Sequence, residues 1–231
     1  MAKRPAPHDA TPRRIDFHSH SYLTDGRASP TDMWNEAEAL DHRALALTDH
    51  LAREDPRPML DRLHREATAW EGAAFVPLVG VELTMLRPAH IAPVARLARR
   101  AGAEIVIVHG ESIVERTPVG TNRAALESGE VDVLAHPGLL TEADAALART
   151  NGVALEISAR PGHSLTNGLV VQRAVAAGAD LVVDSDAHEP SQLVPLARAR
   201  QLALGAGVDV PRLDRVLFTT PEALLRRLRR D

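Results

Sequence analysis

Six of the eleven histidines, together with several carboxylates, stand at or just after the ends of short apolar runs in the chain. The set comprises His18, His20, Asp25, His50, Glu82, His109, His136, Asp186 and His188. Neutral imidazoles beside carboxylates are suitable ligands for zinc, manganese or iron, whereas calcium and magnesium prefer oxygen ligands alone. About nine donors exceed what one ion with an open position can use, so the set predicts two or three divalent metal ions. Such a cluster can hold a bridging hydroxide of lowered pKa, a nucleophile suited to attack at phosphorus.

The apolar runs before these residues are continuous and rich in β-branched residues, as strands buried on both faces are. They span residues 14–17, 44–48, 75–83, 104–108, 131–135, 153–157 and 180–184, with 216–219 as a further candidate. Helix signals lie between them, including Ser29 before Pro30 and Thr141 three residues before Asp144, both typical of helix N-caps. Repeated strand–helix units predict an α/β fold with a parallel sheet. Seven or eight units favour a TIM-like barrel over an open sheet, since no glycine-rich turn follows the first strand.

In a parallel barrel the carboxyl ends of all strands open on the same face, so residues remote in sequence converge there. We therefore expect the histidines and acids at these ends to form one metal centre. Histidines elsewhere in a sequence are usually surface residues or hydrogen-bonded groups. We interpret His8, His42, His64 and His90 in this way.

The length of 231 residues suits one domain, or at most two. Residues 1–13 contain three prolines and are predicted to be a disordered leader, and residues 14–231 a single barrel domain. The chain has no cysteine, which excludes disulfides, thiolate zinc sites and a cysteine nucleophile, and its net charge of −4 gives no general attraction for polyanions. No run of about 18 apolar residues occurs, so we expect no membrane partner and a cytoplasmic location.

Several short motifs occur in a definite order along the chain: His18-Ser19-His20, Asp25-Gly26, Thr48-Asp49-His50, Gly80-Val81-Glu82, His136-Pro137 and Ser185-Asp186-Ala187-His188. In this order and at these strand ends, they resemble the PHP (polymerase and histidinol phosphatase) superfamily over about residues 14–225. The resemblance implies a distorted (β/α)7 barrel with a trinuclear metal centre.

The resemblance also implies how the ligands are shared among three ions. His18, His20, Glu82 and Asp186 would hold the first ion, Glu82 would bridge to a second ion held by His109 and His136, and Asp25, His50 and His188 would hold the third. Members similar to true histidinol phosphatases often carry a histidine where this chain has Asp25, which weakens a specific histidinol phosphate assignment. Asp49 is interpreted as a residue that orients a ligand rather than as a ligand.

Two loops, residues 108–123 and 158–167, should rim the metal face because each follows a strand. Basic residues are almost all arginine, so phosphate binding should use the bidentate guanidinium. Arg160 is the favoured contact, because it directly follows a strand. Glu111 or His163 could donate a proton to the leaving group. The full set of expected substrate contacts is Arg116, Asn122, Arg123, Arg160, His163 and Asn167, and Glu82, Glu111 and His163 are the expected catalytic residues.

These features predict a metal-dependent hydrolase of phosphate esters, with a small phosphomonoester as substrate. The alternative enzyme is a phosphodiesterase or 5′-end exonuclease, for which nucleic acid is a partner only as substrate. The aromatic content of 3% speaks against that alternative, because base-stacking platforms need aromatic rings. A non-catalytic barrel scaffold is a third hypothesis, and the complete ligand set argues against it.

Overall fold

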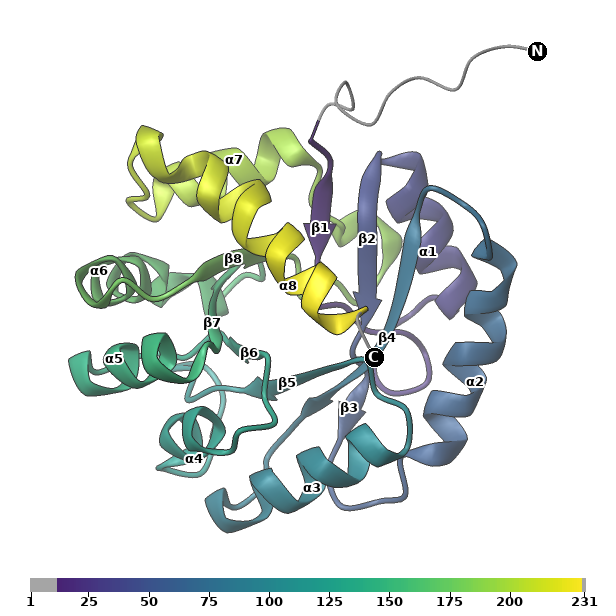
Figure 1. The fold of residues 1–231 in the computed structure, drawn as a ribbon, viewed down its shortest axis with the longest axis horizontal. Helices are drawn as coiled ribbons and strands as arrows, with labels where there is room; N and C mark the ends of the chain where they lie inside the picture. The colour runs from purple at the N-terminus through teal and green to yellow at the C-terminus, as the bar shows by residue number, and fades with distance from the viewer. Residues whose placement is uncertain (1–11, 230–231) are drawn as a thin grey trace.

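In the computed structural model, which describes residues 12–229, parallel strands form a nearly closed barrel surrounded by helices (Figure 1). The strands follow one another around the barrel in the order β1-β2-β4-β5-β6-β7-β8, and β3 extends the sheet by pairing with β4. This arrangement confirms the predicted distorted (β/α)7 barrel. The strands are β1 (Arg14–Asp16), β2 (His42–Leu47), β3 (His50–Leu51), β4 (Val76–Leu83), β5 (Ile105–His109), β6 (Val133–Ala135), β7 (Ala154–Ser158) and β8 (Leu181–Asp184).

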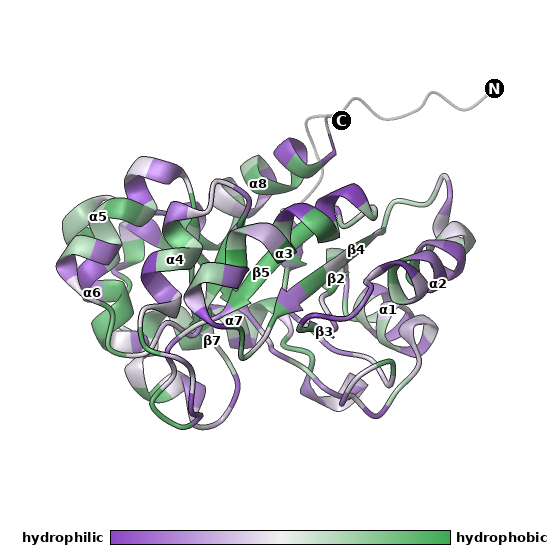
Figure 2. Cartoon of the chain, turned by 90° about the horizontal axis from the view of Figure 1, so that it is seen from below, coloured by the Kyte–Doolittle hydropathy of each residue, from purple (hydrophilic) through white to green (hydrophobic). Residues whose placement is uncertain are grey.

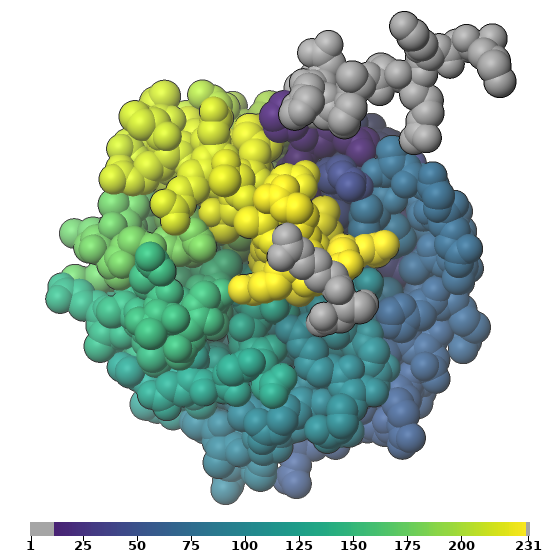
Figure 3. All heavy atoms as spheres, in the orientation of Figure 1, coloured from purple at the N-terminus to yellow at the C-terminus, as the bar shows by residue number. Residues whose placement is uncertain are grey.

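The eight α-helices of the described residues are α1 (Pro30–Ala39), α2 (Arg57–Ala67), α3 (Pro88–Arg100), α4 (Thr121–Glu127), α5 (Glu142–Asn151), α6 (Asn167–Ala177), α7 (Leu196–Gly205) and α8 (Thr220–Leu228). Two of them begin as the sequence predicts. The Ser29 side chain accepts a hydrogen bond from the backbone N–H of Asp32, and Thr141 does the same for Asp144. Helix α8 differs from the others, because it crosses the amino-terminal end of the barrel and covers the middle of that face (Figures 1 and 3).

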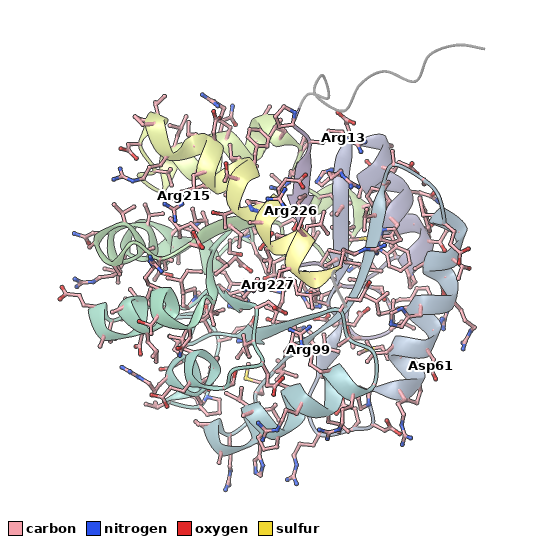
Figure 4. The ribbon with its side chains drawn as sticks, in the orientation of Figure 1. Arg13, Asp61, Arg99, Arg215, Arg226 and Arg227 are labelled. Atoms are coloured by element: carbon pink, nitrogen blue, oxygen red, sulfur yellow. The ribbon has the colours of Figure 1, made fainter. Side chains whose placement is uncertain are left out.

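The barrel has an inner and an outer apolar layer. The outer layer lies between the strands and the helices. The inner layer fills the interior of the barrel, on the amino-terminal side of the strand ends that carry the polar residues. In Figure 2, β5 is among the strands coloured green for hydrophobic residues. Leu224 and Leu225 of α8 belong to the inner layer, so this helix closes the amino-terminal end. Asp132 holds α8 in place by pairing with Arg227 at 3.3 Å, and it also pairs with Arg99. Both arginines are labelled in Figure 4.

Side chains alternate along each strand, and this alternation carries polar residues to the top of the inner layer. On β4, Leu78 points inward and Glu82 lies four residues further along the same face; on β5, Ile105 and His109 are related in the same way. Gly80 between Leu78 and Glu82 leaves room for β5, because a Cβ atom there would lie 2.4 Å from the Ile105 side chain. The polar residues at the carboxyl ends of the strands therefore lie directly above the apolar inner layer.

The gap between the first and last strands is bridged just beyond their ends. Ser19 and Ala187 form a parallel bridge, His20 N donates to Ala187 O at 2.8 Å, and Asp186 N donates to His18 O at 2.9 Å. These bonds fix the loop after β1 against the loop after β8. The His18-Ser19-His20 and Asp186-Ala187-His188 motifs are thus locked together by backbone hydrogen bonds.

The prediction of a strand at residues 216–219 is wrong. Arg215–Thr219 form a turn of π-helix that leads into α8, and Val216 and Leu217 are buried in the outer layer. A four-residue apolar run fits a buried helix as well as a strand, so the sequence could not separate the two. Most of the predicted leader, residues 1–11, lies outside the described residues, and the division into leader and single domain stays a prediction. Among residues 12–229, no helix is long and apolar enough to cross a membrane.

Candidate metal centre

All nine predicted ligand residues gather at the carboxyl ends of the strands, on the face opposite α8. A first group contains His18, His20 and Asp186, whose donor atoms all lie within 4.8 Å of one another. His18 Nε2 and His20 Nε2 are 3.1 Å apart, and His20 Nε2 lies 3.4 Å from Asp186 Oδ1. The three side chains are buried, so their nitrogen and oxygen atoms have little access to water.

Glu82 stands at the middle of the centre and is only 1% exposed. Its Oε1 lies 3.5 Å from both His18 Nε2 and His136 Nε2, and its Oε2 lies 2.8 Å from His50 Nδ1. Burial alone would raise the pKa of Glu82, but the charge of His18 and the nearby His136 and His50 side chains lower the pKa well below its usual value. A buried carboxylate that reaches three imidazoles can bridge two cations, and its Oε1 has no hydrogen-bond partner in this structure.

A second group contains His20, Asp25, His50 and His188, again with donor atoms within 4.8 Å. Asp25 Oδ2 lies 3.1 Å from His188 Nε2 and 3.4 Å from His50 Nε2. The Asp25 side chain is about half exposed, at 51%, so this group forms the open side of the centre. His20 is common to both groups and lies between them.

A third group contains His109, His136 and His163. His109 and His136 are predicted ligands, whereas His163 was expected to contact substrate or donate a proton. All three are buried, and the His136 ring stacks on the His163 ring with centroids 4.0 Å apart. The structure thus places His163 among candidate metal ligands.

Burial and neighbouring charges divide the histidines into neutral and charged ones. Burial lowers the pKa values of His20 and His163 to about 4. Burial acts in the same direction on His50, but hydrogen bonds and charge from Asp25 and Glu82 outweigh it and raise the pKa of His50 to about 10. A histidine must be unprotonated to bind a metal, so a cation at this site would displace the proton of His50.

Two ligand residues have a backbone conformation that is rare outside glycine. His136 has φ +26° and Asp186 has φ +50°, each directly after or close to the end of a strand. Such strain persists only where the surrounding structure enforces it, and it is common at functional sites. At both positions it turns a side chain into the centre instead of continuing the strand.

Supporting residues contact the Nδ1 atoms of two of the histidines and fix the orientation of their rings. Glu156 Oε2 lies 2.6 Å from His18 Nδ1, and the Gly110 carbonyl lies 3.1 Å from His109 Nδ1. In the tautomer with its proton on Nδ1, His109 donates to this carbonyl, and its Nε2 can then bind a metal. Asp49, expected to orient a ligand, accepts hydrogen bonds from Ser21 and Thr24 and so holds the loop that carries Asp25.

Two contributors to the centre were missed by the sequence analysis. Glu156 lies inside β7 in the run Ala154-Leu155-Glu156-Ile157, where a buried acid in an apolar strand was the available signal. Glu115 lies on the loop after β5 and lines the centre, with Oε2 3.0 Å from His109 Nε2. An acid in a polar loop is common on protein surfaces, so no sequence signal set it apart.

Arg160, like His163, is a predicted substrate contact that the structure brings to the metal face. It contacts Asp186 Oδ1 at 3.3 Å and His188 Nε2 at 2.8 Å, and its side chain is 32% exposed. Arg116 is exposed on the loop that also carries Glu115.

The other predicted substrate contacts and Glu111 form hydrogen bonds or ion pairs with neighbouring residues in the structure. Arg123 pairs with Asp144 at 2.9 Å between α4 and α5. The Asn167 amide bonds to the backbone of Ser158, and Asn122 donates to the Pro137 carbonyl. Glu111, expected as a proton donor, accepts from the backbone N–H groups of Gly120 and Asn122 at the start of α4. These side chains fold the rim loops, because backbone groups there need partners.

Comparison with known proteins agrees with this architecture. Residues 16–160 match the PHP domain family. An uncharacterized protein of Methanocaldococcus jannaschii is 36% identical over 217 residues, which are 93% of this chain and 100% of that protein. A probable phosphatase of Shewanella sp. strain ANA-3 is 38% identical over 112 residues, 44% of this chain and 43% of that protein.

Among solved structures, the histidinol phosphate phosphatase of Lactococcus lactis, complexed with zinc, L-histidinol and phosphate, shares the fold. The TM-score is 0.59 at 15% identity, over 85% of this chain and 95% of that chain. The family match covers more than half of the sequence, and its span contains seven of the nine clustered ligand residues, His18 to His136. This chain belongs to the PHP domain family.

Proposed function

We propose that this protein is a metal-dependent hydrolase of phosphate esters whose substrate is a small phosphomonoester. The observation that supports it most is the buried Glu82 carboxylate, which lies within 3.5 Å of His18 and His136 and 2.8 Å from His50. A carboxylate in that position can join cations held by separate histidine groups. The family match and the phosphatase name of a relative agree with this chemistry.

The donor groups fit divalent transition ions. The first ion would take His18, His20, Asp186 and Glu82; the second would share Glu82 with His109 and His136; the third would take Asp25, His50 and His188. When bound, such ions lower the pKa of water and neutralise phosphate charge, which supplies the nucleophile and stabilises the transition state. Imidazole and carboxylate donors favour zinc, manganese or iron over calcium.

Arg160 supplies the chain's own cation at the substrate side. Its guanidinium lies beside Asp186 of the first group and His188 of the second group. A phosphomonoester dianion has three terminal oxygens, and a guanidinium can hold two of them in a bidentate manner. We expect Arg160 to turn from His188 to the phosphate when substrate enters.

A cavity of about 490 Å³ opens beside Arg160 and gives space for the leaving group. Its lining combines polar residues, among them Asp25, Arg27, Ser185 and Gln192, with the apolar Ala159, Pro161 and Val194. This volume lies in the range of small-molecule sites, and its lining suits a polar leaving group. The cavity joins the open side of the centre at Asp25.

The experiment is a substrate panel assayed with metal-loaded protein. Metal-free protein is reloaded with Zn²⁺, Mn²⁺ or Fe²⁺ and assayed on phosphomonoesters, phosphodiesters and 5′-phosphorylated oligonucleotides. We expect phosphate release from monoesters, lost in Glu82→Gln prepared in parallel, which excludes a contaminating phosphatase. Turnover confined to diesters or oligonucleotides would replace the proposed substrate class with the nuclease alternative. No turnover of any ester by protein shown to hold its ions would overturn the proposal.

A further inference from the structure

His163 lies after β7, at the start of a short 3-10 helix (His163–Thr166), and it is only 3% exposed. Its donor atom lies within 4.8 Å of those of His109 and His136, which come from β5 and from the end of β6. The ring centroid of His163 is 4.0 Å from that of His136 and 5.8 Å from that of His109. Two strand ends and the segment after β7 therefore bring three buried imidazoles together.

The spacing of these rings is similar to that of the second group, in which His20 lies beside His50 and His188. There, His20 lies 4.4 Å from His50 and 4.3 Å from His188, and the outer pair is 6.3 Å apart. In the His163 group, the corresponding centroid distances are 4.0, 4.4 and 5.8 Å. In both groups the donor atoms themselves lie within 4.8 Å of one another.

The contact at Nδ1 of His163 is compatible with coordination through its other ring nitrogen, Nε2. Ser112 Oγ lies 2.7 Å from His163 Nδ1, and both atoms belong to buried residues. When Nδ1 donates to the serine oxygen, the ring is fixed and its Nε2 lone pair is available, as in most histidines that bind metals. His109 is prepared in the same way by the carbonyl of Gly110.

Glu115 completes this group from the solvent side. Its Oε2 lies 3.0 Å from His109 Nε2 and its Oε1 lies 3.4 Å from His163 Nε2. Ligand atoms about 2.1 Å from one ion stand about 3.0 to 3.4 Å apart, so these separations fit donors that share a cation. Glu115 is 40% exposed on a loop, whereas His109 and His163 are each 3% exposed. It is therefore the donor that can leave with least rearrangement.

We propose that His163 is a further ligand of the ion shared by Glu82, His109 and His136, and that Glu115 occupies the outer position of that ion until a phosphate oxygen displaces it. This inference rests on the metal centre proposed above. A carboxylate and a phosphate compete for the same cation, so the loop around Glu115 would close the position when substrate is absent. Arrival of a dianion would exchange one anionic oxygen donor for another and free the loop.

The first test measures metal retention, not activity. Wild type, His163→Asn and a control, His64→Asn, are loaded with Zn²⁺, dialysed against chelators of increasing strength and analysed for metal per chain. His64 contacts the carbonyl of Gly102, and neither residue lines the centre. We expect His163→Asn to lose one ion at least about tenfold more readily than wild type, with the other ions retained, because a lost ligand should cost at least what a lost supporting contact does.

Cobalt spectroscopy and a second variant address misfolding. Ser112→Ala keeps the His163 ring but removes the partner of its Nδ1, together with a 3.4 Å hydrogen bond from the backbone N–H of Val114, so we expect a smaller loss of the same ion. In Co²⁺-loaded protein, His163→Asn should change the visible absorption of one ion, while thermal unfolding of the metal-free variant stays like that of wild type. Retention of every ion by His163→Asn with affinity within about twofold of wild type would overturn the ligand role. Wild type that binds fewer than two ions would instead overturn the metal centre itself.

Inorganic phosphate tests the role of Glu115. Because Glu115→Gln removes the competing charge, we expect Mn²⁺-loaded variant to bind phosphate at least about threefold more tightly than wild type by titration calorimetry. The matched control is Glu127→Gln, an exposed acid on α4 whose partner is Arg123 at 3.8 Å. Unchanged or weaker phosphate binding by Glu115→Gln would show that Glu115 does not hold the position that phosphate takes.

Discussion

Oε2 of Glu156 lies 2.6 Å from Nδ1 of His18, and both side chains are fully buried. Burial acts to lower the pKa of His18, but the charges of Glu156, Asp186 and Glu82 outweigh it and raise the pKa well above its usual value. Glu156 therefore fixes the ring so that its opposite nitrogen, Nε2, faces Glu82 at 3.5 Å. A carboxylate behind a ligating histidine raises the basicity of that ligand.

Glu156→Gln tests this relationship. The amide keeps the shape of the side chain but removes its charge, so we expect affinity for the first ion to fall by about 10- to 100-fold. The measurement is competition with a chromophoric chelator, beside Glu38→Gln, an acid on α1 that bonds Trp70 outside the centre. Equal affinities in Glu156→Gln and wild type would show that the contact does not tune the metal.

Removing the charge of Glu82 should reduce metal content and activity more than removing the charge of Asp25. Glu82 is 1% exposed and reaches three histidines, whereas the Asp25 side chain is 51% exposed and reaches two. We expect Glu82→Gln to lose more than one metal equivalent and nearly all phosphatase activity, and Asp25→Asn to lose at most one equivalent. Elemental analysis and turnover of the same preparations check this. Small, equal losses in the two variants would reject Glu82 as the bridging ligand.

Arg160→Lys tests whether phosphate binding depends on the bidentate geometry of the guanidinium or only on its positive charge. The lysine keeps the positive charge near Asp186 but loses the bidentate fork, so we expect kcat/KM for a phosphomonoester to fall about tenfold, or about 1.4 kcal/mol. Diester hydrolysis should fall less, because a diester has one fewer charge. Arg116→Lys, on the exposed part of the rim, is the matched control. Intact monoester turnover with abolished diester cleavage would favour the nuclease alternative.

His42 should make the fold sensitive to acid. It is fully buried on β2, where burial and the charge of Arg14 outweigh Asp16 and lower its pKa to about 4. An unfolded histidine titrates near 6.5, so between about pH 6.5 and 4 the unfolded state binds more protons. Above about pH 6.5, His42 is neutral in both states and the folded protein keeps its full stability. As the pH falls from about 6.5 to 4, the free energy of unfolding decreases by about 3 kcal/mol.

The measurement is the free energy of unfolding in urea at pH 7 and at pH 4.5 for wild type and His42→Gln. We expect the difference between the two pH values to be smaller in His42→Gln, which does not titrate. Metal-free protein is used throughout, so that protonation of the ligand residues affects both proteins alike. The same pH dependence in both would assign the acid sensitivity to other groups.

The sequence alone determined the barrel and most of the candidate centre. Continuous β-branched runs marked β1, β2, β4, β5, β6, β7 and β8 to within about two residues at either end. Because parallel strands end on one face, the residues after those runs had to converge, and the nine predicted ligands do lie together. Backbone topology, not fine side-chain placement, decides that convergence.

The tertiary structure decided what the loops and the inner strand faces contribute. Glu111, Asn122 and Asn167 bond to nearby backbone groups, which a sequence cannot identify because loop paths depend on packing between distant segments. Glu115 and His163 meet because the loops after β5 and β7 lie over the same histidines. Pairings of this kind depend on distances of a few ångströms between residues far apart in the chain, and the local pattern of either segment carries no information about them.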